Sequence, residues 1–234
     1  MSTFESRKRS RELNEKLIKL ALTSAAAISI LTTFGILFSI LFEAIEFFKL
    51  RSFWYFITGA TWSPGVIGSQ FGALPIFAGT FVITIIALGV AIPVGLGSAI
   101  YMSEYASANI RDYLKPLLEI LAGIPTVVYG FFAAITVAPL VVQIAEFFGL
   151  EATFNSALAS GVVMGIMIIP VISSLSDDVI RAVPDSQRKA AFALGMTHGE
   201  TIKNIVLPSA MPGIISASLL GLSKALGETM IVVM

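Results

Sequence analysis

Two charged residues interrupt the apolar stretch at the end of this sequence, and they are the strongest candidates for chemistry. Lys224 and Glu228 are four positions apart, so one face of a helix would carry both. A lone lysine at the centre of a bilayer costs roughly 2.5–3.5 kcal/mol on insertion scales, so intramembrane charges usually serve a function. The ammonium could meet an anion, and the carboxylate could gate or release it. We therefore predict a substrate pathway at Lys224, Glu228 and Thr229, near the bilayer midplane if the span starts at Gly213; a structural pair that locks two helices is the alternative.

The one long basic loop between apolar stretches is the second candidate. Within residues 183–208 the pattern predicts a helix–turn–helix, with Pro184 at the start of the first helix. Gly195 stands where a helix would end in a left-handed residue. Thr197–Glu200 has the spacing of a capping box, and Pro208 is expected to end the second helix.

A compact helical surface of small and apolar residues suits docking of another protein. DNA binding is the alternative for a helix–turn–helix, but acidic residues offset the few basic ones and apolar stretches flank the loop, so we predict no nucleic acid. A purely structural loop is the other alternative. The residues predicted to make this docking surface are Lys189, Ala190, Ala191, Gly195, Ile205, Leu207 and Pro208.

Motifs of catalysis are absent from the sequence. It contains no G-x4-G-K-S/T phosphate loop, no HExxH and no GxSxG. It has no cysteine, which excludes disulfides and thiolate metal sites. We predict no catalytic residue, no metal site and no cofactor bound by this chain.

The elements that must position these sites are membrane helices. The chain is 56% hydrophobic and only 13% charged, far from the average of soluble proteins. A helix needs about 20 apolar residues to cross a bilayer, and prolines such as Pro93 and Pro125 fall within two of the stretches that qualify. The predicted fold is all-α, with spans at Leu17–Phe42, Leu74–Met102, Leu117–Val142, Ser156–Leu175 and Gly213–Met234.

Basic residues set the expected orientation. They gather before the first span and in the loops after the second and fourth spans, whereas Lys49 and Arg51 alone lie in the opposite loops. The positive-inside rule places the N-terminus and the 183–208 loop in the cytoplasm of a multi-pass protein in the cell membrane. Asp177 and Asp178 follow the fourth span and are expected to be solvated at the same rim.

This orientation divides the chain into four parts. We expect a cytoplasmic N-terminus at 1–16, a first transmembrane helix at 17–42, an external interfacial segment at 43–72, and a core at 73–234 with its cytoplasmic loop at 176–212. The external segment is rich in Phe and Trp, which favour the membrane–water interface. The last span has no returning helix after it, so we expect one further span to be missing at the C-terminus.

The loop resembles the coupling loop of ABC-importer permeases. That family carries Glu-Ala-Ala, three residues, Gly, nine residues and Ile-x-Leu-Pro. Here Lys189-Ala-Ala, Gly195 and Ile205-x-Leu-Pro208 keep every spacing, with lysine in place of the leading glutamate. The resemblance implies an ABC-importer permease (MetI-like) fold whose loop docks a cytoplasmic ATPase.

Five further segments, spread from Phe71 to the end, carry a second resemblance: Phe71–Pro75, Pro93–Gly97, Ser103–Ala106, Leu121–Gly130 and Lys224–Met230. They resemble the phosphate-importer permeases of the PstC type rather than the PstA type. Lys224 stands where that family has arginine.

This resemblance implies a transport subunit for inorganic phosphate rather than an enzyme. The implied partners are a second permease subunit (PstA-like), a cytoplasmic ATPase (PstB-like) that uses ATP and Mg, an external phosphate-binding protein (PstS-like) and the lipid bilayer. A permease for sulfate or molybdate is the first alternative, and a non-transporting scaffold that recruits a cytoplasmic protein is the second. An intramembrane enzyme that uses Glu228 is the weakest.

Overall fold

The computed structural model of the chain is helical and describes residues 2–65, 69–149 and 156–228, with side chains from residue 14 onward. Five helical stretches within these residues are long and apolar enough to cross a membrane, as the sequence predicts. They are Asn14–Leu50, Leu74–Tyr105, Thr126–Phe147, Ala157–Arg181 and His198–Gly227. The chain divides into two compact units, Met1–Pro75 and Ile76–Met234.

The first unit consists of a long helix followed by a small aromatic cap. Helix α1 (Ser2–Leu50) extends past both ends of the predicted first span. After it come the short helix α2 (Phe53–Thr58) and the paired two-residue strands β1 (Trp62–Ser63) and β2 (Gln70–Phe71), with Trp62 opposite Phe71. The segment predicted to be external therefore contains the end of α1, the short helix α2 and one antiparallel strand pair.

Aromatic rings and two glycines hold the cap together. Phe47 of α1 makes edge-to-face contacts with Phe56 and Phe71, whose centroids lie 5.6 and 5.7 Å away. A Cβ on Gly72 would lie 2.2 Å from the carbonyl oxygen of Gly59, so this backbone crossing needs glycine.

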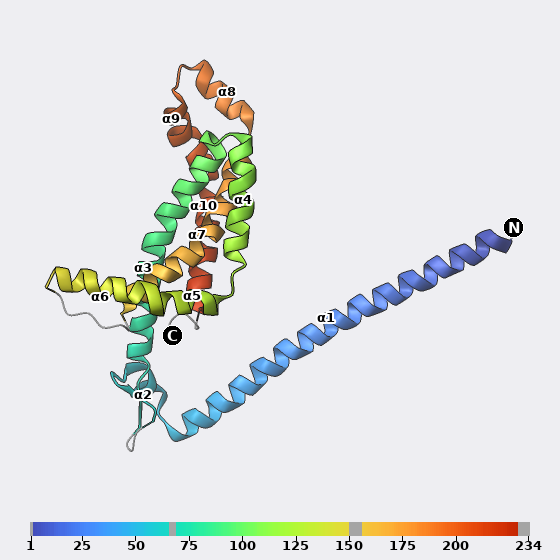
Figure 1. Cartoon of the computed structure of the whole chain (residues 1–234). Coiled ribbons are helices and arrows are strands. Elements are labelled where there is room, and N and C mark those ends of the chain that lie inside the picture. Colours follow the sequence, from blue (N-terminus) through green and yellow to red (C-terminus); the bar gives the residue numbers. More distant parts are fainter. Residues whose placement is uncertain (1, 66–68, 150–155, 229–234) are drawn as a thin grey trace. The chain divides into compact units, whose positions relative to one another are not determined.

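The second unit is a helical bundle. Helices α3 and α7 run toward the end that carries α8 and α9, and α4 and α10 run back from it (Figure 1). Its elements are α3 (Leu74–Ile100), which begins just before the unit boundary, the π-helical turn η1 (Tyr101–Tyr105), α4 (Ala108–Ala122), α5 (Thr126–Phe132), the π-helical turn η2 (Ala133–Val137), α6 (Ala138–Phe147), α7 (Ala157–Arg181), α8 (Asp185–Ala193), α9 (His198–Thr201), the π-helical turn η3 (Ile202–Val206) and α10 (Leu207–Gly227).

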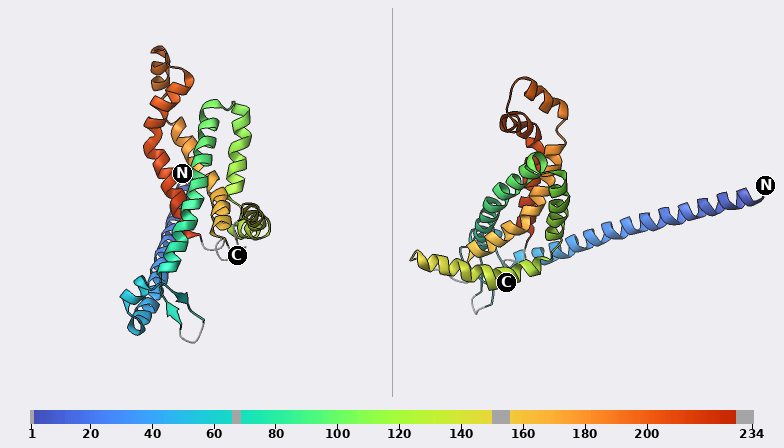
Figure 2. Two further views of the ribbon diagram at one scale, coloured as in Figure 1. Left: turned by 90° about the vertical axis from the view of Figure 1, so that its left-hand side faces the viewer. Right: turned by 45° about the horizontal axis from the view of Figure 1, so that its top comes forward.

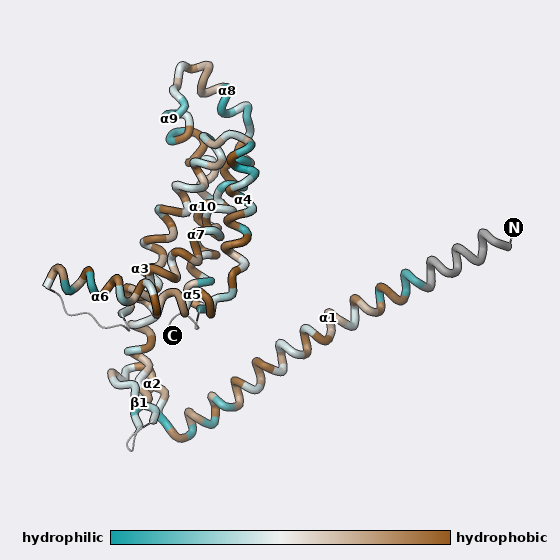
Figure 3. The backbone as a smooth tube through the Cα atoms, viewed as in Figure 1, coloured by the Kyte–Doolittle hydropathy of each residue, from teal (hydrophilic) through white to brown (hydrophobic). Residues whose placement is uncertain are grey.

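Helix α7 forms the centre of this bundle. Its residues Val163, Ile168 and Ile172 are fully buried between α3 and α10. Figure 3 shows the apolar helices and the more polar α8 end. In lipid, helices pack through close van der Waals contact rather than through the hydrophobic effect, so small residues mark their contacts.

Glycines provide these contacts. A Cβ on Gly165 of α7 would lie 2.9 Å from the carbonyl oxygen of Ala87 and from Cβ of Val90 on α3. A Cβ on Gly221 of α10 would lie 3.0 Å from Ile168 on α7. The backbones of α3, α7 and α10 therefore approach as closely as their side chains allow.

The predicted third span is wrong in its bounds. The chain breaks at Gly123–Pro125, and Pro125 is the N-cap of α5 rather than a residue inside a helix. Proline cannot donate the backbone hydrogen bond that a continuing helix needs. Helix α4 therefore brings the chain back from the α8 end, and the segment α5–η2–α6 lies crosswise at the other end (Figures 1 and 2).

Pro208 was expected to end a helix, but it does not. Helix α9 continues through η3 into α10, and Pro208 is the second residue of α10. In η3 the Leu207 N–H bonds to the Ile202 carbonyl, five residues back. This wider turn just before Pro208 accommodates a residue that has no N–H.

The glycine contacts give a stability prediction. Gly165→Ala should lower the free energy of unfolding by about 1–3 kcal/mol, because the added methyl overpacks the α3–α7 contact. Gly89→Ala, in α3, is the matched control: its Cβ would meet nothing within 4 Å, so stability should stay equal or rise. Thermal unfolding of the purified protein in detergent measures both, and equal stability of the two variants would contradict the packing described.

Candidate functional site

The predicted helix–turn–helix is present at the exposed end of the bundle. Helix α8 begins after Pro184, as expected. Gly195 has a φ of +82°, the left-handed conformation that favours glycine. The Met196 N–H bonds to the Ala191 carbonyl at 3.2 Å and the Gly195 N–H to the Phe192 carbonyl at 3.0 Å. These two bonds form a Schellman motif, which closes α8.

The capping box of α9 is also confirmed. The Thr197 hydroxyl accepts a hydrogen bond from the Glu200 N–H, and the Glu200 carboxylate accepts one from the Thr197 N–H at 2.8 Å. Because the Schellman motif ends at Met196 and the capping box begins at Thr197, the turn between α8 and α9 is fixed on both sides.

A groove of about 530 Å³ lies between α8 and the start of α10. Four predicted docking residues contribute to it: Ala190, Ala191, Ile205 and Pro208. The other lining residues are Gln187, Leu194, Met196, Asn204 and Ser209. Small side chains on α8 and an apolar floor make this groove suitable for an apolar side chain of a partner.

The remaining predicted docking residues lie beside the groove. Gly195 forms the turn, Leu207 is half-buried and packs against the apolar cluster around Ile180 and Val206, and Lys189 is exposed on α8. The structure thus gathers the predicted set at one end of the bundle and places Leu207 underneath the surface.

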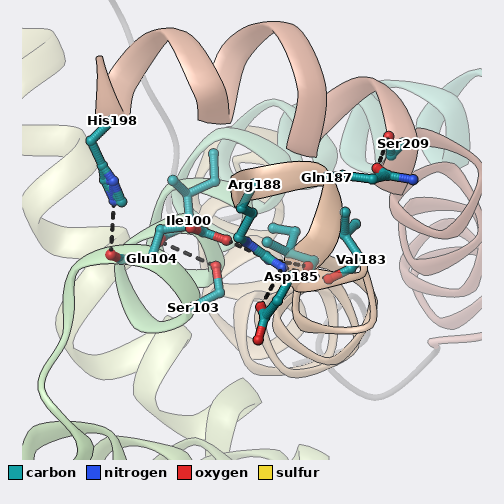
Figure 4. A network of polar contacts seen from close by, with 10 residues as sticks. Ile100, Ser103, Glu104, Val183, Asp185, Gln187, Arg188, His198 and Ser209 are labelled. Atoms are coloured by element: carbon teal, nitrogen blue, oxygen red, sulfur yellow. Dashed lines mark hydrogen bonds and ion pairs between the residues drawn. The ribbon is translucent and has the colours of Figure 1, made fainter. Parts of the chain in front are cut away.

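Arg188, which the sequence analysis did not single out, fastens this surface to the bundle (Figure 4). Its guanidinium forms an ion pair with Glu104 of η1 at 2.8 Å. It also donates to the Ile180 carbonyl at 2.9 Å and to the Val183 carbonyl. These carbonyls lie at the C-terminal end of α7, where a helix leaves acceptors unpaired.

His198, the first residue of α9, is a second contact of this surface with η1. Its Nε2 lies 3.3 Å from the Glu104 carbonyl oxygen. Its ring packs edge-on to Tyr105 at 5.1 Å and stacks with Phe192 of α8 at 6.2 Å. The imidazole therefore serves as a packing group between three elements.

The expectation that Asp177 is solvated is wrong. Asp177 is completely buried in α7 and pairs with Arg111 of α4 at 2.8 Å, while Lys115 lies 4.0 Å away. Asp178, the next residue, is 54% exposed and pairs with Lys115 at 2.5 Å. The helix turn points one carboxylate into the α4–α7 contact and the other outward, so only Asp177 depends on Arg111 for its neutralisation.

The predicted pathway residues do not lie together on one helix, as the sequence analysis had placed them. Lys224 is half-buried in the last turn of α10, beside the buried Ala225. The helix ends at Gly227, and Glu228 has an extended conformation with ψ 125°. Lys224 and Glu228 therefore do not share a helical face. Thr229 lies outside the described residues.

The position of Lys224 along its helix also changes. The expected midplane location counted from Gly213, but α10 begins at Leu207 and continues the helix of α9. At 1.5 Å per residue, Lys224 lies roughly 26 Å beyond Leu207. It is thus near the end of the helix that is remote from the groove.

The missed residues carried a weak signal in the sequence. Glu104, Arg111 and Asp177 each sit within a few residues of a long apolar stretch, where an unpaired charge is costly. Their pairing, however, joins positions far apart in the chain. A single sequence contains no information on which charge meets which.

Comparison with known proteins gives one matching family. Residues 91–234 match the family described as the binding-protein-dependent transport system inner membrane component. The chain is 33% identical over 231 residues to a probable ABC transporter permease protein, YqgH of Bacillus subtilis (strain 168), covering 98% of this chain and 74% of that protein. It is also 33% identical over 221 residues to the phosphate transport system permease protein PstC 1 of Mycobacterium bovis, covering 82% of this chain but only 65% of that relative.

A solved structure shares the fold. A chain of the MetNI methionine ABC transporter, in inward-facing conformations, superimposes with a TM-score of 0.51. The match covers 67% of this chain and 68% of the other, at 21% identity. It confirms the predicted MetI-like arrangement of helices.

The buried ion pair generates a stability prediction. Asp177→Ala should lower the free energy of unfolding by about 3–5 kcal/mol, because it leaves the Arg111 guanidinium without its buried counterion. Asp178→Ala is the matched control and should cost at most about 1 kcal/mol, since that side chain is exposed.

The double variant Arg111→Met with Asp177→Leu should recover most of the stability, because an apolar pair replaces the two charges. Denaturant titration in detergent compares the four proteins. A double variant as unstable as Asp177→Ala would show that the pair contributes more than charge neutralisation.

Proposed function

The chain belongs to the family of binding-protein-dependent transport system inner membrane components, and on that premise we propose that it forms the translocation pathway for inorganic phosphate in an ABC importer. As a permease component of that family it is not itself an ATPase. It is an inner-membrane, multi-pass helical protein.

The similarity to a relative named as a phosphate transport permease is the observation that carries the choice of cargo. Lys224 supports it, because a half-buried cation at the end of an apolar helix suits an anion. An ammonium offers a point charge where a guanidinium would offer a planar fork, and both bind phosphate oxygens. Sulfate and molybdate, which are also oxyanions, are the competing cargos.

The groove between α8 and α10 supports docking of a separate ATPase. It lies at the polar end of the bundle, together with the basic residues Arg111, Lys115 and Lys203, and far along the chain from the aromatic cap. By the positive-inside rule this end and the N-terminus face the cytoplasm, where ATP is available. A second permease subunit in the membrane and a phosphate-binding protein on the outer side complete the proposed importer.

Filling the groove should weaken the binding of the ATPase to this chain. Ala190→Trp places an indole in the groove and should weaken association with the ATPase by roughly 2–4 kcal/mol, the range of an interface hot spot. Ser186→Trp, on the exposed surface of α8 outside the groove lining, is the matched control and should leave association unchanged. Co-purification of the two subunits measures both variants. Wild-type association of Ala190→Trp would place the ATPase elsewhere.

Removal of the cation should abolish transport without disturbing assembly. Lys224→Ala should reduce uptake of radiolabelled phosphate roughly thirtyfold or more, corresponding to at least about 2 kcal/mol for a lost buried charge contact. Lys224→Arg keeps the charge and should retain uptake. Membrane insertion and ATPase association are the controls, and normal uptake by Lys224→Ala would remove this residue from the pathway.

Competition decides the cargo. Uptake of radiolabelled phosphate by the wild-type complex should persist in excess sulfate or molybdate and fall only with unlabelled phosphate. Equal competition by either oxyanion would overturn the choice of phosphate, and a complex with neither uptake nor cargo-stimulated ATP hydrolysis would indicate a scaffold instead.

A further inference from the structure

A single side chain connects the docking surface to the bundle at three points. The two terminal nitrogens of Arg188, on α8, reach the Glu104 carboxylate of η1, the Ile180 carbonyl in the last turn of α7 and the Val183 carbonyl just after it. They also reach Asp185 at the start of α8. Figure 4 shows these bonds converging on one guanidinium. Arginine can do this because its planar fork presents several donors in fixed directions.

Burial separates the strong contacts from the weak one. The side chains of Arg188 and Glu104 are 16% and 7% exposed, so water screens their 2.8 Å ion pair little. Asp185 is 83% exposed and 3.4 Å away, so its contact with Arg188 contributes little. The Arg188–Glu104 pair and the two carbonyl bonds therefore form the junction between α8 and the spans.

The backbone at this junction is itself unusual. Glu104 lies in η1, a π-helical turn that ends α3, and η3, a second π-helical turn, joins α9 to α10. Such widened turns inside α-helices are frequent at functional sites and allow local adjustment. Helix α8 has only Ala191 buried; its other contacts include the stack of Phe192 on His198 and the bond from the Ser209 hydroxyl to Gln187. Arg188 adds to these a shielded ion pair and two bonds at the end of α7.

We propose that Arg188 is a positioning residue, which makes α8 move as one body with the cytoplasmic ends of α3 and α7. When a docked ATPase displaces α8, the junction transmits the displacement to these two spans rather than letting α8 swing on its connections. The transmission step rests on the proposed docking of an ATPase, whereas the attachment of α8 does not.

The attachment can be measured by itself, because the chain has no cysteine and accepts unique labels. Spin labels on Ser186→Cys in α8 and Asn109→Cys in α4, both exposed positions, report the distance between the docking surface and the bundle in the intact chain. The distribution should be narrow in the parent and broad in Arg188→Met or Glu104→Gln. Arg181→Met removes an exposed arginine from the last turn of α7 and should leave it narrow.

Unchanged distributions in both junction variants would overturn the proposal. Two variants are used because Glu104→Gln keeps the shape of the side chain and removes only its charge, so it should fold even if Arg188→Met does not. Neither ATP nor cargo enters this measurement, so its result stands apart from the identity of the transported ion.

Transmission is tested in the assembled importer. At equal amounts of complex, Arg188→Met should keep ATP hydrolysis but lower phosphate transported per ATP roughly fivefold or more, the size of a typical coupling between sites. Arg188→Lys retains charge but loses the fork, and should restore part of the ratio. A wild-type ratio in Arg188→Met would contradict the proposal, because a merely structural residue changes the amount of complex and not this ratio. If the parent complex shows no phosphate-coupled ATPase, the proposed function fails while the spin-label result still decides the junction.

Discussion

A carboxylate that has no access to water must meet a cation, and this constraint organises the described part of the chain from residue 76 onward. Asp177 is completely buried on α7, and Arg111 of α4 neutralises it. The pair fixes α4 against the helix at the centre of the bundle. One turn further along α7, the Ile180 carbonyl accepts a hydrogen bond from Arg188 of α8, and Arg188 also pairs with Glu104 of η1. Two neighbouring ion pairs thus build the end of the bundle on which the docking groove lies.

The remaining packing depends on size rather than charge. Gly165 and Gly221 let α3 and α10 approach α7 until backbone and side chains touch. Close contact of this kind stabilises helices against one another in the membrane. Apolar side chains gain no hydrophobic free energy by leaving lipid, because lipid is as apolar as they are. The spans are therefore held by contact along their length and by ion pairs at the polar end, which is the arrangement that the proposed transmission from α8 into α3 and α7 requires.

The sequence predicted the features that depend on local pattern. Hydropathy located the apolar helices, and the residues around Gly195 and Thr197 specified a turn whose Schellman motif and capping box are both present. The docking residues were found because their spacing resembles a known loop. Four of them line one groove, which requires only that two short helices lie side by side.

Features that depend on tertiary context were predicted less well. Pro93 and Pro125 both fall within apolar stretches, but Pro93 stays inside α3, whereas the chain breaks at Pro125 and its second half lies crosswise. The two prolines look alike in the sequence, and only the tertiary packing distinguishes them. Pro208 was expected to end a helix, but the π-helical turn η3 precedes it and the helix continues through Pro208 into α10. Asp177 and Asp178 look alike in sequence, and only the packing of α4 decides that one is buried. Glu228 was expected to share a helical face with Lys224, but α10 ends at Gly227 and Glu228 follows it in an extended conformation.

The central claim is that the α8–α9 surface faces the cytoplasm and is covered by an ATPase. Leu194→Cys would be the chain's single cysteine, at a groove position whose native side chain is 82% exposed. A membrane-impermeant maleimide should label it in inside-out vesicles and not in right-side-out ones, and co-assembly with the ATPase should protect it. Labelling from the outer side, or equal labelling with and without the ATPase, would contradict the account.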